Sequence, residues 1–202
     1  RLGLPHVESK LEGEMGNIMV DRQGRLFTTE KLIEDNREKF KRKEIIEDLK
    51  KTFNVKEVHI FPAHPKDGGI GHIDIFAKYL GNINGKETVV VSKSIDAEVQ
   101  KMLNLTARKF KRLGFKVVRI EEYEQKIRKG APGFANSIIV NQTIMMPIYS
   151  KGMENPPERL IQLEKAAEAT YRSLGFEVVT IDSYAPIRGM GAIHCMTCTI
   201  SQ

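Results

Sequence analysis

An internal repeat limits what this chain can fold into more than any other feature of its sequence. Residues 113–120, Leu-Gly-Phe-Lys-Val-Val-Arg-Ile, recur at 174–181 as Leu-Gly-Phe-Glu-Val-Val-Thr-Ile. A weaker copy, Phe-Asn-Val-Lys-Glu-Val-His-Ile, occupies 53–60. Glycine, or asparagine in its place, adopts the left-handed backbone conformation that ends a helix. Each copy is therefore predicted to be the end of a helix followed by a short, largely apolar strand.

The residues before each copy predict that helix, with two strands ahead of it. Apolar residues recur at spacings of three and four over 99–113 and 160–174, and less clearly over 45–53, which is the period of one buried helix face. Turns at Gly24 and at Asn84-Gly85 separate two of the strand pairs. The predicted strands are 17–21 with 25–29, 72–80 with 88–92, 135–141 with 143–149, and a further first strand at 192–200.

The predicted unit is strand, strand, helix, strand. It occurs three times, at about 16–62, 71–121 and 133–182, before a final strand at 191–200. Units of this size that repeat along a chain form either a solenoid or a closed ring. Because the sequence ends on one apolar strand and not on a polar capping unit, we expect an α/β ring that forms a single domain over residues 1–202. The alternative is an ordinary α/β sheet with chance similarity between the copies.

Composition narrows the classes of function. The chain has 202 residues with 32 Lys and Arg against 26 Asp and Glu, a net charge of +6. Much of the excess lies over 37–51, where acidic residues are interspersed, as is typical of a solvated helix face. Aromatic residues make up 7% and Trp is absent, so a base-stacking nucleic-acid surface is not expected. No run approaches the ~18 apolar residues of a transmembrane helix.

Polar side chains stand near the start of each predicted first strand, where a buried strand would be apolar. In a ring with pseudo-symmetry, equivalent strand ends point towards one axis. These side chains are therefore predicted to converge on a central pocket. They are Asn17 after Gly16, His72 and Asp74 after Gly71, Asn136 after Gly133, and His194 and Cys195 after Gly191.

Two of these groups leave alternatives open. His72 and Asp74 are two residues apart and share one face of a strand, so they could be a structural hydrogen-bonded pair or two ligands of a metal ion. Cys195 and Cys198 spell Cys-x-x-Cys, but no other cysteine is present to complete a zinc site. On a strand the two thiols would point to opposite faces, which disfavours a disulfide. A single cysteine with a histidine elsewhere in the chain is a candidate nucleophile.

Four stretches, in chain order, resemble the bacterial-type peptidylarginine deiminases and agmatine deiminases. Residues 71–80, Gly-His-Ile-Asp-Ile-Phe-Ala-Lys-Tyr-Leu, are similar to the histidine–aspartate strand of that family. Residues 189–197, Gly-Met-Gly-Ala-Ile-His-Cys-Met-Thr, are similar to its C-terminal nucleophile motif. Residues 134–141, followed by Met146-Pro147, resemble the strand pair between them, and 12–21 with 28–30 resemble its acidic, glycine-containing stretch.

The resemblance implies the pentein fold of the guanidino-group-modifying enzymes, an α/β propeller of five strand-strand-helix-strand modules. Nothing before Glu12 matches the family's tryptophan–arginine–aspartate segment, which carries a further acidic substrate ligand. We therefore expect the first one or two modules to be missing here, so that either another segment or a second chain supplies them or the protein lacks them. Glu14 and Met15 are inserted where the family runs Glu-Gly-Gly.

The resemblance also implies hydrolytic deimination of a guanidino group. Cys195 would be the nucleophile, His72 the general acid and base, and Asp74 the carboxylate that grips the guanidinium, with Asn136 in the pocket wall. A covalent thiouronium intermediate, ammonia and a ureido product would follow, without a metal or other cofactor.

The expected partner is a small molecule or peptide with a guanidino group, of the peptidylarginine, arginine or agmatine type. We expect neither a membrane nor a nucleic acid as partner, leave a homo-oligomer open, and favour a cytoplasmic location. Because the N-terminal acidic ligand is missing, a non-catalytic, pentein-like guanidino-binding module is the alternative function. A basic nucleic-acid binder that uses residues 37–51 is a third.

Overall fold

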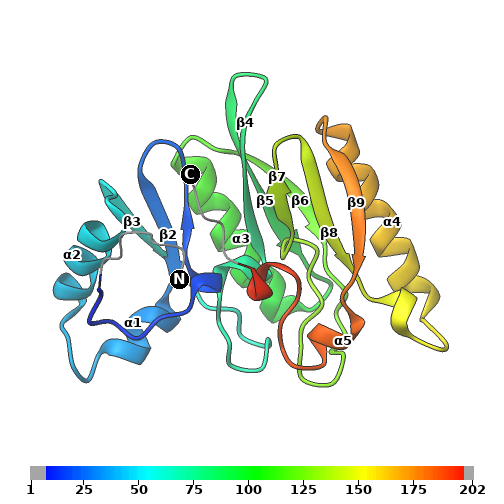
Figure 1. The fold of residues 1–202 in the computed structure, drawn as a ribbon, viewed down its shortest axis with the longest axis horizontal. Coiled ribbons are helices and arrows are strands. Elements are labelled where there is room, and N and C mark those ends of the chain that lie inside the picture. Colours follow the sequence, from blue (N-terminus) through cyan, green and yellow to red (C-terminus); the bar gives the residue numbers. More distant parts are fainter. Residues whose placement is uncertain (1–7, 198–202) are drawn as a thin grey trace, which may run out of the picture.

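Three small mixed sheets lie side by side in the structure, a computed structural model that describes residues 8–197 (Figure 1). In each sheet the first two strands are antiparallel and the second and third are parallel. The strand orders are β1-β2-β3, β4-β5-β6 and β7-β8-β9. The strands are β1 (Met19–Val20), β2 (Arg25–Thr29), β3 (Glu57–Phe61), β4 (Ala77–Ile83), β5 (Lys86–Lys93), β6 (Lys116–Glu121), β7 (Ile138–Val140), β8 (Thr143–Ile148) and β9 (Glu177–Asp182).

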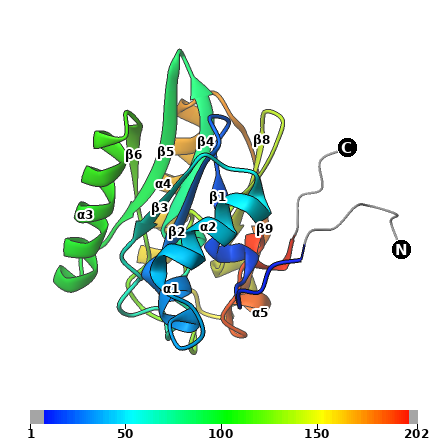
Figure 2. The same ribbon diagram turned by 90° about the vertical axis from the view of Figure 1, so that its left-hand side faces the viewer.

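Helices connect the two parallel strands of each sheet, because parallel neighbours cannot be joined by a tight turn. α2 and α4 lie at the two ends of the row of sheets in Figure 1, and Figure 2 shows α3 on the outer side of the middle sheet. The helices are α1 (Glu30–Asn36), α2 (Arg42–Phe53), α3 (Ala97–Arg112), α4 (Glu158–Ser173) and α5 (Tyr184–Ile187). The described residues also contain four 3-10 turns: η1 (Met15–Asn17), η2 (Ile73–Ile75), η3 (Ser150–Gly152) and η4 (His194–Met196).

The three long helices end where the sequence predicts. Asn54, Gly114 and Gly175 have φ values of 50°, 88° and 92°, the left-handed conformation that stops a helix. A parallel strand begins two or three residues later in each case. The predicted helices that end at 113 and 174 are confirmed as α3 and α4.

The predicted first strands begin too early. His72 and Asp74 belong to the turn at η2, and β4 starts only at Ala77. The strand predicted at 192–200 begins instead with the 3-10 turn η4, and its residues 198–200 lie outside the described part of the chain. Backbone groups at both turns bond to asparagine side chains from distant segments, and this competes with strand pairing. The argument that His72 and Asp74 share a strand face is therefore wrong.

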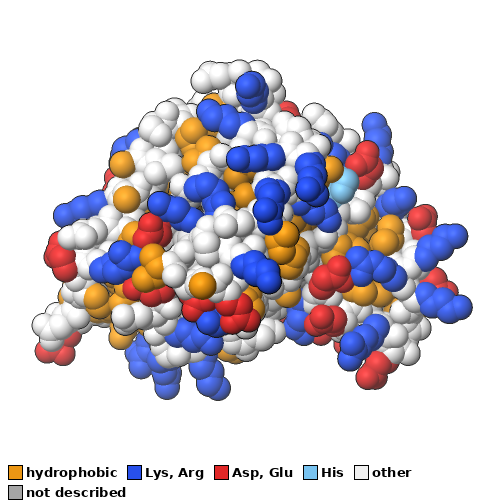
Figure 3. Space-filling model, turned by 180° about the vertical axis from the view of Figure 1, so that it is seen from behind, with side chains coloured by type: hydrophobic (Ala, Val, Ile, Leu, Met, Phe, Trp, Pro, Cys, Tyr) orange, Lys and Arg blue, Asp and Glu red, His pale blue; other side chains and the backbone are white. Residues whose placement is uncertain are grey.

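The fold is mixed α/β, and within residues 8–197 the sheets do not close into a barrel. The propeller ring therefore stays a prediction. On the face shown in Figure 3, Lys and Arg are spread over the surface with Asp and Glu among them. Along α2, Arg42 and Lys50 form exposed ion pairs with Glu30 and Glu47, as expected of a solvated face. None of the helices in the described residues is both long and apolar enough to cross a bilayer.

An aromatic cluster joins the first sheet to the second. Phe27 and Phe61 from the first sheet pack on Phe110 of α3, and the rings of Phe61 and Phe110 stack with centroids 4.4 Å apart. All three side chains are fully buried. Arg25 of the first sheet adds to this contact between the sheets. Its guanidinium lies over the Phe115 ring, 4.4 Å from the centroid, and donates a hydrogen bond to the carbonyl of Leu113.

We predict that Phe110→Ala lowers the free energy of unfolding by about 3–5 kcal/mol, because it opens a cavity in this cluster. Leu105→Ala, on the exposed side of the same helix, is the matched control and should change it by less than about 0.5 kcal/mol. Urea denaturation followed by circular dichroism measures both. Equal, small effects of the two substitutions would contradict the packing described.

Candidate active site

The turn that carries His72 and Asp74 is held by its own loop. The Asp67 carboxylate accepts the backbone N–H groups of Gly69 and Gly71, at 3.0 and 2.6 Å. Gly71 has a φ of 66° and is packed against the side chain of Lys31, so a larger residue would meet both strain and a clash. The chain thus turns sharply just before His72.

Asn17 fixes the same turn from the first sheet. Its Oδ1 accepts from Thr29 N and Ile73 N, each at 3.2 Å. Thr29 Oγ1 in turn donates to the carbonyl of Gly71 at 2.6 Å. Asn17 and Thr29 are both buried, so water cannot replace these bonds. The position of η2 therefore depends on a side chain 56 residues earlier in the chain.

Asn136 plays the corresponding part for Cys195. Its Oδ1 accepts from His194 N at 2.9 Å, while its Nδ2 donates to Cys195 Sγ at 3.1 Å and to Asp74 Oδ2 at 2.9 Å. Asn17 and Asn136 thus each bind the backbone of a 3-10 turn in the following unit. One amide side chain ties the carboxylate and the thiol together.

Asp74 lies at the centre of this network, and only 3% of its surface is exposed. Its Oδ2 is 2.8 Å from Nδ1 of His194 and accepts from the Cys195 thiol at 3.4 Å. Oδ1 is buried and has no hydrogen-bond partner within the part of the chain that the structure describes. A buried carboxylate oxygen without a donor is costly, so this atom is a natural acceptor for a bound cation.

Cys195 lies in η4 and not on the predicted strand. The residue reaches solvent at a cavity, whereas its sulfur faces Asp74 and Asn136. Desolvation by the surrounding protein and then the negative charge of Asp74 raise the pKa of Cys195 to about 11. The thiol is therefore protonated at neutral pH in the structure as it stands.

His72 faces the thiol side of the site. It lines a cavity of about 520 Å³ together with Cys195, Glu14 and Gly16. Nε2 of His72 lies 3.9 Å from Oε2 of Glu14, a largely exposed carboxylate. A Cβ on Gly16 would come within 2.9 Å of Asp74 Oδ2 and 3.0 Å of His72 Nδ1, so only glycine lets the chain pass this close.

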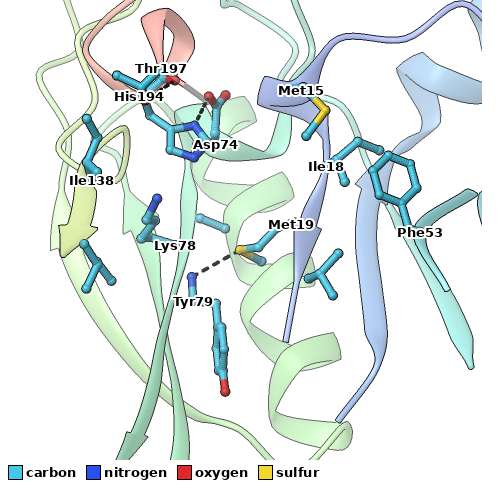
Figure 4. A pocket seen from close by; sticks show the side chains of 13 residues that line it. Met15, Ile18, Met19, Phe53, Asp74, Lys78, Tyr79, Ile138, His194 and Thr197 are labelled. Atoms are coloured by element: carbon cyan, nitrogen blue, oxygen red, sulfur yellow. Dashed lines mark hydrogen bonds and ion pairs between the residues drawn. The ribbon is translucent and has the colours of Figure 1, made fainter. Parts of the chain in front are cut away.

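A second cavity of about 360 Å³ lies on the carboxylate side (Figure 4). Most of the residues that line it are apolar. Its charged or titratable side chains are those of Asp74, Lys78, Tyr79 and His194. Removal from water lowers the pKa of Lys78 to about 8, against the opposing influence of Asp74 and Cys195. Lys78 thus adds positive charge close to the carboxylate and the thiol.

The structure brings Asp74, Asn136 and Cys195 into direct contact and places His72 beside the same cavity as Cys195. The sequence arguments placed His194 among the polar residues of the predicted central pocket, without a chemical role, and gave no site role to Lys78 or Glu14. His194 adjoins Cys195, and Glu14 lies in the insertion noted in the glycine stretch, so both signals were in the sequence. Among residues 8–197, no group of three or more His, Cys, Asp or Glu side chains is arranged to hold a metal ion. Cys198 lies outside the described residues.

Comparison with known proteins places this chain in a family. The sequence profile of the Porphyromonas-type peptidyl-arginine deiminases matches residues 1–200. The chain belongs to this family. No curated protein sequence matches it.

Solved structures share the fold at low sequence identity. A Porphyromonas gingivalis protein assigned as an arginine deiminase matches with a TM-score of 0.72 at 23% identity, over 89% of this chain and 54% of its own. The C. jejuni agmatine deiminase matches with 0.70 at 20%, over 94% and 55%. The Enterococcus faecalis agmatine deiminase matches with 0.68 at 20%, over 89% and 55%. The chain thus spans little more than half the length of these relatives, and the likeness is one of fold.

We predict that Asn17→Ala lowers the free energy of unfolding by about 1–3 kcal/mol, because two buried backbone donors lose their acceptor. Asn104→Ala, on the exposed side of α3, is the control and should cost much less. Thermal unfolding measures both. If Asn17→Ala were as stable as the control, Asn17 would not hold the η2 turn.

We also predict that alkylation of Cys195 by neutral iodoacetamide, which needs the thiolate, accelerates as pH rises towards about 11. Asp74→Asn removes a negative charge, lowers the pKa of Cys195 and should therefore speed alkylation at pH 8. A Cys198→Ser background restricts labelling to one cysteine, and mass spectrometry follows the rate. A slower reaction in Asp74→Asn would contradict the electrostatic effect assigned to Asp74.

Proposed function

We propose that this chain carries a cysteine-dependent centre for hydrolytic deimination of a guanidino group. The observation that carries the proposal is the direct contact of a buried carboxylate, Asp74, with an amide and a thiol, Asn136 and Cys195. Membership of a deiminase family supports the class of reaction. The substrate is of the peptidylarginine, arginine or agmatine type.

Asp74 would hold the substrate. A guanidinium keeps its charge at any useful pH and presents several N–H donors in one plane, which suits a carboxylate. The buried and unpartnered Oδ1 of Asp74 supports this role, because a bound N–H would satisfy it. Gripped in this way, the central carbon of the guanidinium is fixed beside the sulfur of Cys195.

Cys195 would attack that carbon. Arrival of a cation next to the thiol favours the thiolate, which offsets the effects that raise the pKa of Cys195 in the free protein. The thiol proton passes to His72 while the sulfur electron pair forms the S–C bond, and the electrons of one C–N double bond move onto nitrogen. A tetrahedral adduct results, held by Asp74.

His72 would then act as acid and as base. It returns the proton to the leaving nitrogen, the C–N bond breaks, and ammonia departs from a covalent thiouronium. Water, deprotonated by the same imidazole, adds to this carbon. The C–S bond breaks, the sulfur takes back a proton, and the ureido product leaves. The shared cavity of about 520 Å³ that His72 and Cys195 line supports this division of roles.

A guanidino-binding module without turnover is the second candidate function. The raised pKa of Cys195 favours it, since a protonated thiol is a poor nucleophile. So does the length of the chain, little more than half that of the solved relatives. Such a module would bind through Asp74 in the same way and release neither ammonia nor a ureido product.

We expect the protein to release ammonia and a ureido product from at least one of agmatine, free arginine and an arginyl peptide. Cys195→Ser should abolish turnover, and His72→Ala should lower kcat by about 10²–10⁴, the usual contribution of a general acid–base group. Cys198→Ser is the control cysteine and should keep activity. Colorimetric detection of the ureido group measures all four proteins.

The outcomes separate the two functions. Guanidino ligands that bind to the wild type and give no product, even over long incubation, indicate the binding module. Turnover that survives in Cys195→Ser shows that the nucleophile is assigned wrongly. Absence of both binding and turnover with all three compounds contradicts both functions.

A further inference from the structure

We infer that His194 is a gate residue, whose imidazole occupies the place on Asp74 that a guanidinium group would take and leaves only when a cation replaces it. The inference rests on the proposed function of the same site. It adds a role for His194 and a reason why the site would accept cationic ligands and reject neutral ones. Its basis is the contact of 2.8 Å between His194 Nδ1 and Asp74 Oδ2, visible as a dashed line in Figure 4.

The imidazole lies at the boundary of the two cavities of the site, which Met15 and Thr197 also line. Asp74 lines the cavity of about 360 Å³, whereas Cys195 and His72 line the one of about 520 Å³. His194 lines both. The carboxylate and the thiol, which must act on one guanidinium, therefore face different spaces while the imidazole is in place. Once it swings aside, both spaces adjoin the carboxylate.

The side chain can leave without moving the nucleophile. The backbone N–H of His194 is bound to Asn136 Oδ1 at 2.9 Å, and the same amide donates to Cys195 Sγ. The imidazole is 27% exposed, whereas the side chain of Asp74 is only 4% exposed. Rotation of the His194 side chain therefore suffices, with η4 anchored and the carboxylate fixed.

An empty Asp74 is an unfavourable state. Its Oδ1 already lacks a donor, and loss of the imidazole would leave Oδ2 with only Asn136 and the weak thiol donor. A buried carboxylate left in this way is strongly destabilised. The gate therefore opens at little cost only when the incoming group brings both N–H donors and positive charge. A guanidinium supplies both, whereas a neutral amide or urea supplies donors alone.

The same exchange favours release of the product. Deimination converts the guanidinium into a neutral ureido group, which loses the charge that held it to Asp74. The imidazole of His194 then binds the carboxylate of Asp74 more favourably than the neutral product does, and it displaces the product. One contact thus selects the cationic substrate and discards the neutral product.

Protection of Cys195 from alkylation tests the gate without requiring turnover. In a Cys198→Ser background, neutral iodoacetamide labels Cys195 in the presence of methylguanidine or its neutral isostere methylurea. We expect methylguanidine to protect the wild-type site, because its central carbon lies against the sulfur and blocks the reagent even though the cation favours the thiolate, and methylurea to protect poorly. His194→Ala removes the competitor, so half-protection should need about tenfold less methylguanidine, and His194→Leu should behave in the same way. His194→Gln keeps an N–H donor and should stay closer to the wild type.

Met196→Ala, an exposed neighbour on η4 that lines neither cavity, is the matched control and should leave protection unchanged. If His194→Ala and His194→Leu, folded by circular dichroism, need as much methylguanidine as the wild type or more, the gate is wrong, whether or not the protein turns over substrate. If the shift occurs in a protein that releases no ammonia, the gate stands and the proposed catalysis fails.

Discussion

The buried carboxylate of Asp74 is the constraint on which the site depends. A carboxylate taken out of water costs several kcal/mol unless donors or cations replace its hydration. Asn136, His194 and Cys195 all direct hydrogen-bond donors to one of its oxygens, and the other oxygen is left open. The site is thus organised around a negative charge that is only partly satisfied. Such a charge favours a cationic ligand over any neutral one.

Two asparagines fix the backbone turns that carry the residues of this site. Asn17 holds the turn of His72 and Asp74, and Asn136 holds the turn of His194 and Cys195. Each reaches from the start of one sheet into the turn that follows it in the next unit, so the polar contact repeats as the sheets do. The helices and parallel strands form the apolar scaffold, and the amides set Asp74 and Cys195 at its edge. Displacement of either turn would separate the thiol from the carboxylate.

Electrostatics link binding to reactivity. Desolvation and the negative charge of Asp74, which would attract a guanidinium, raise the pKa of Cys195, so the thiol is a weak nucleophile in the free protein. Desolvation lowers the pKa of Lys78 to about 8 and the negative charges of Asp74 and Cys195 oppose that shift, so Lys78 lies within their electrostatic reach. A cationic substrate would therefore both displace the imidazole and favour the thiolate. Recognition and activation would then depend on the same carboxylate.

Local sequence patterns predicted the ends of α2, α3 and α4, the parallel strands after them, and the polar residues of the pocket, among them Asp74, Asn136 and Cys195. Helix periodicity and left-handed stops at Asn54, Gly114 and Gly175 depend on near neighbours, which a sequence displays directly. That Ile73–Ile75 and His194–Met196 form 3-10 turns depends on tertiary contacts, because distant asparagine side chains accept hydrogen bonds from their backbone N–H groups. Tertiary packing also places His194 on Asp74 and Glu14 near His72, since side-chain contacts between residues far apart in the chain leave no local pattern.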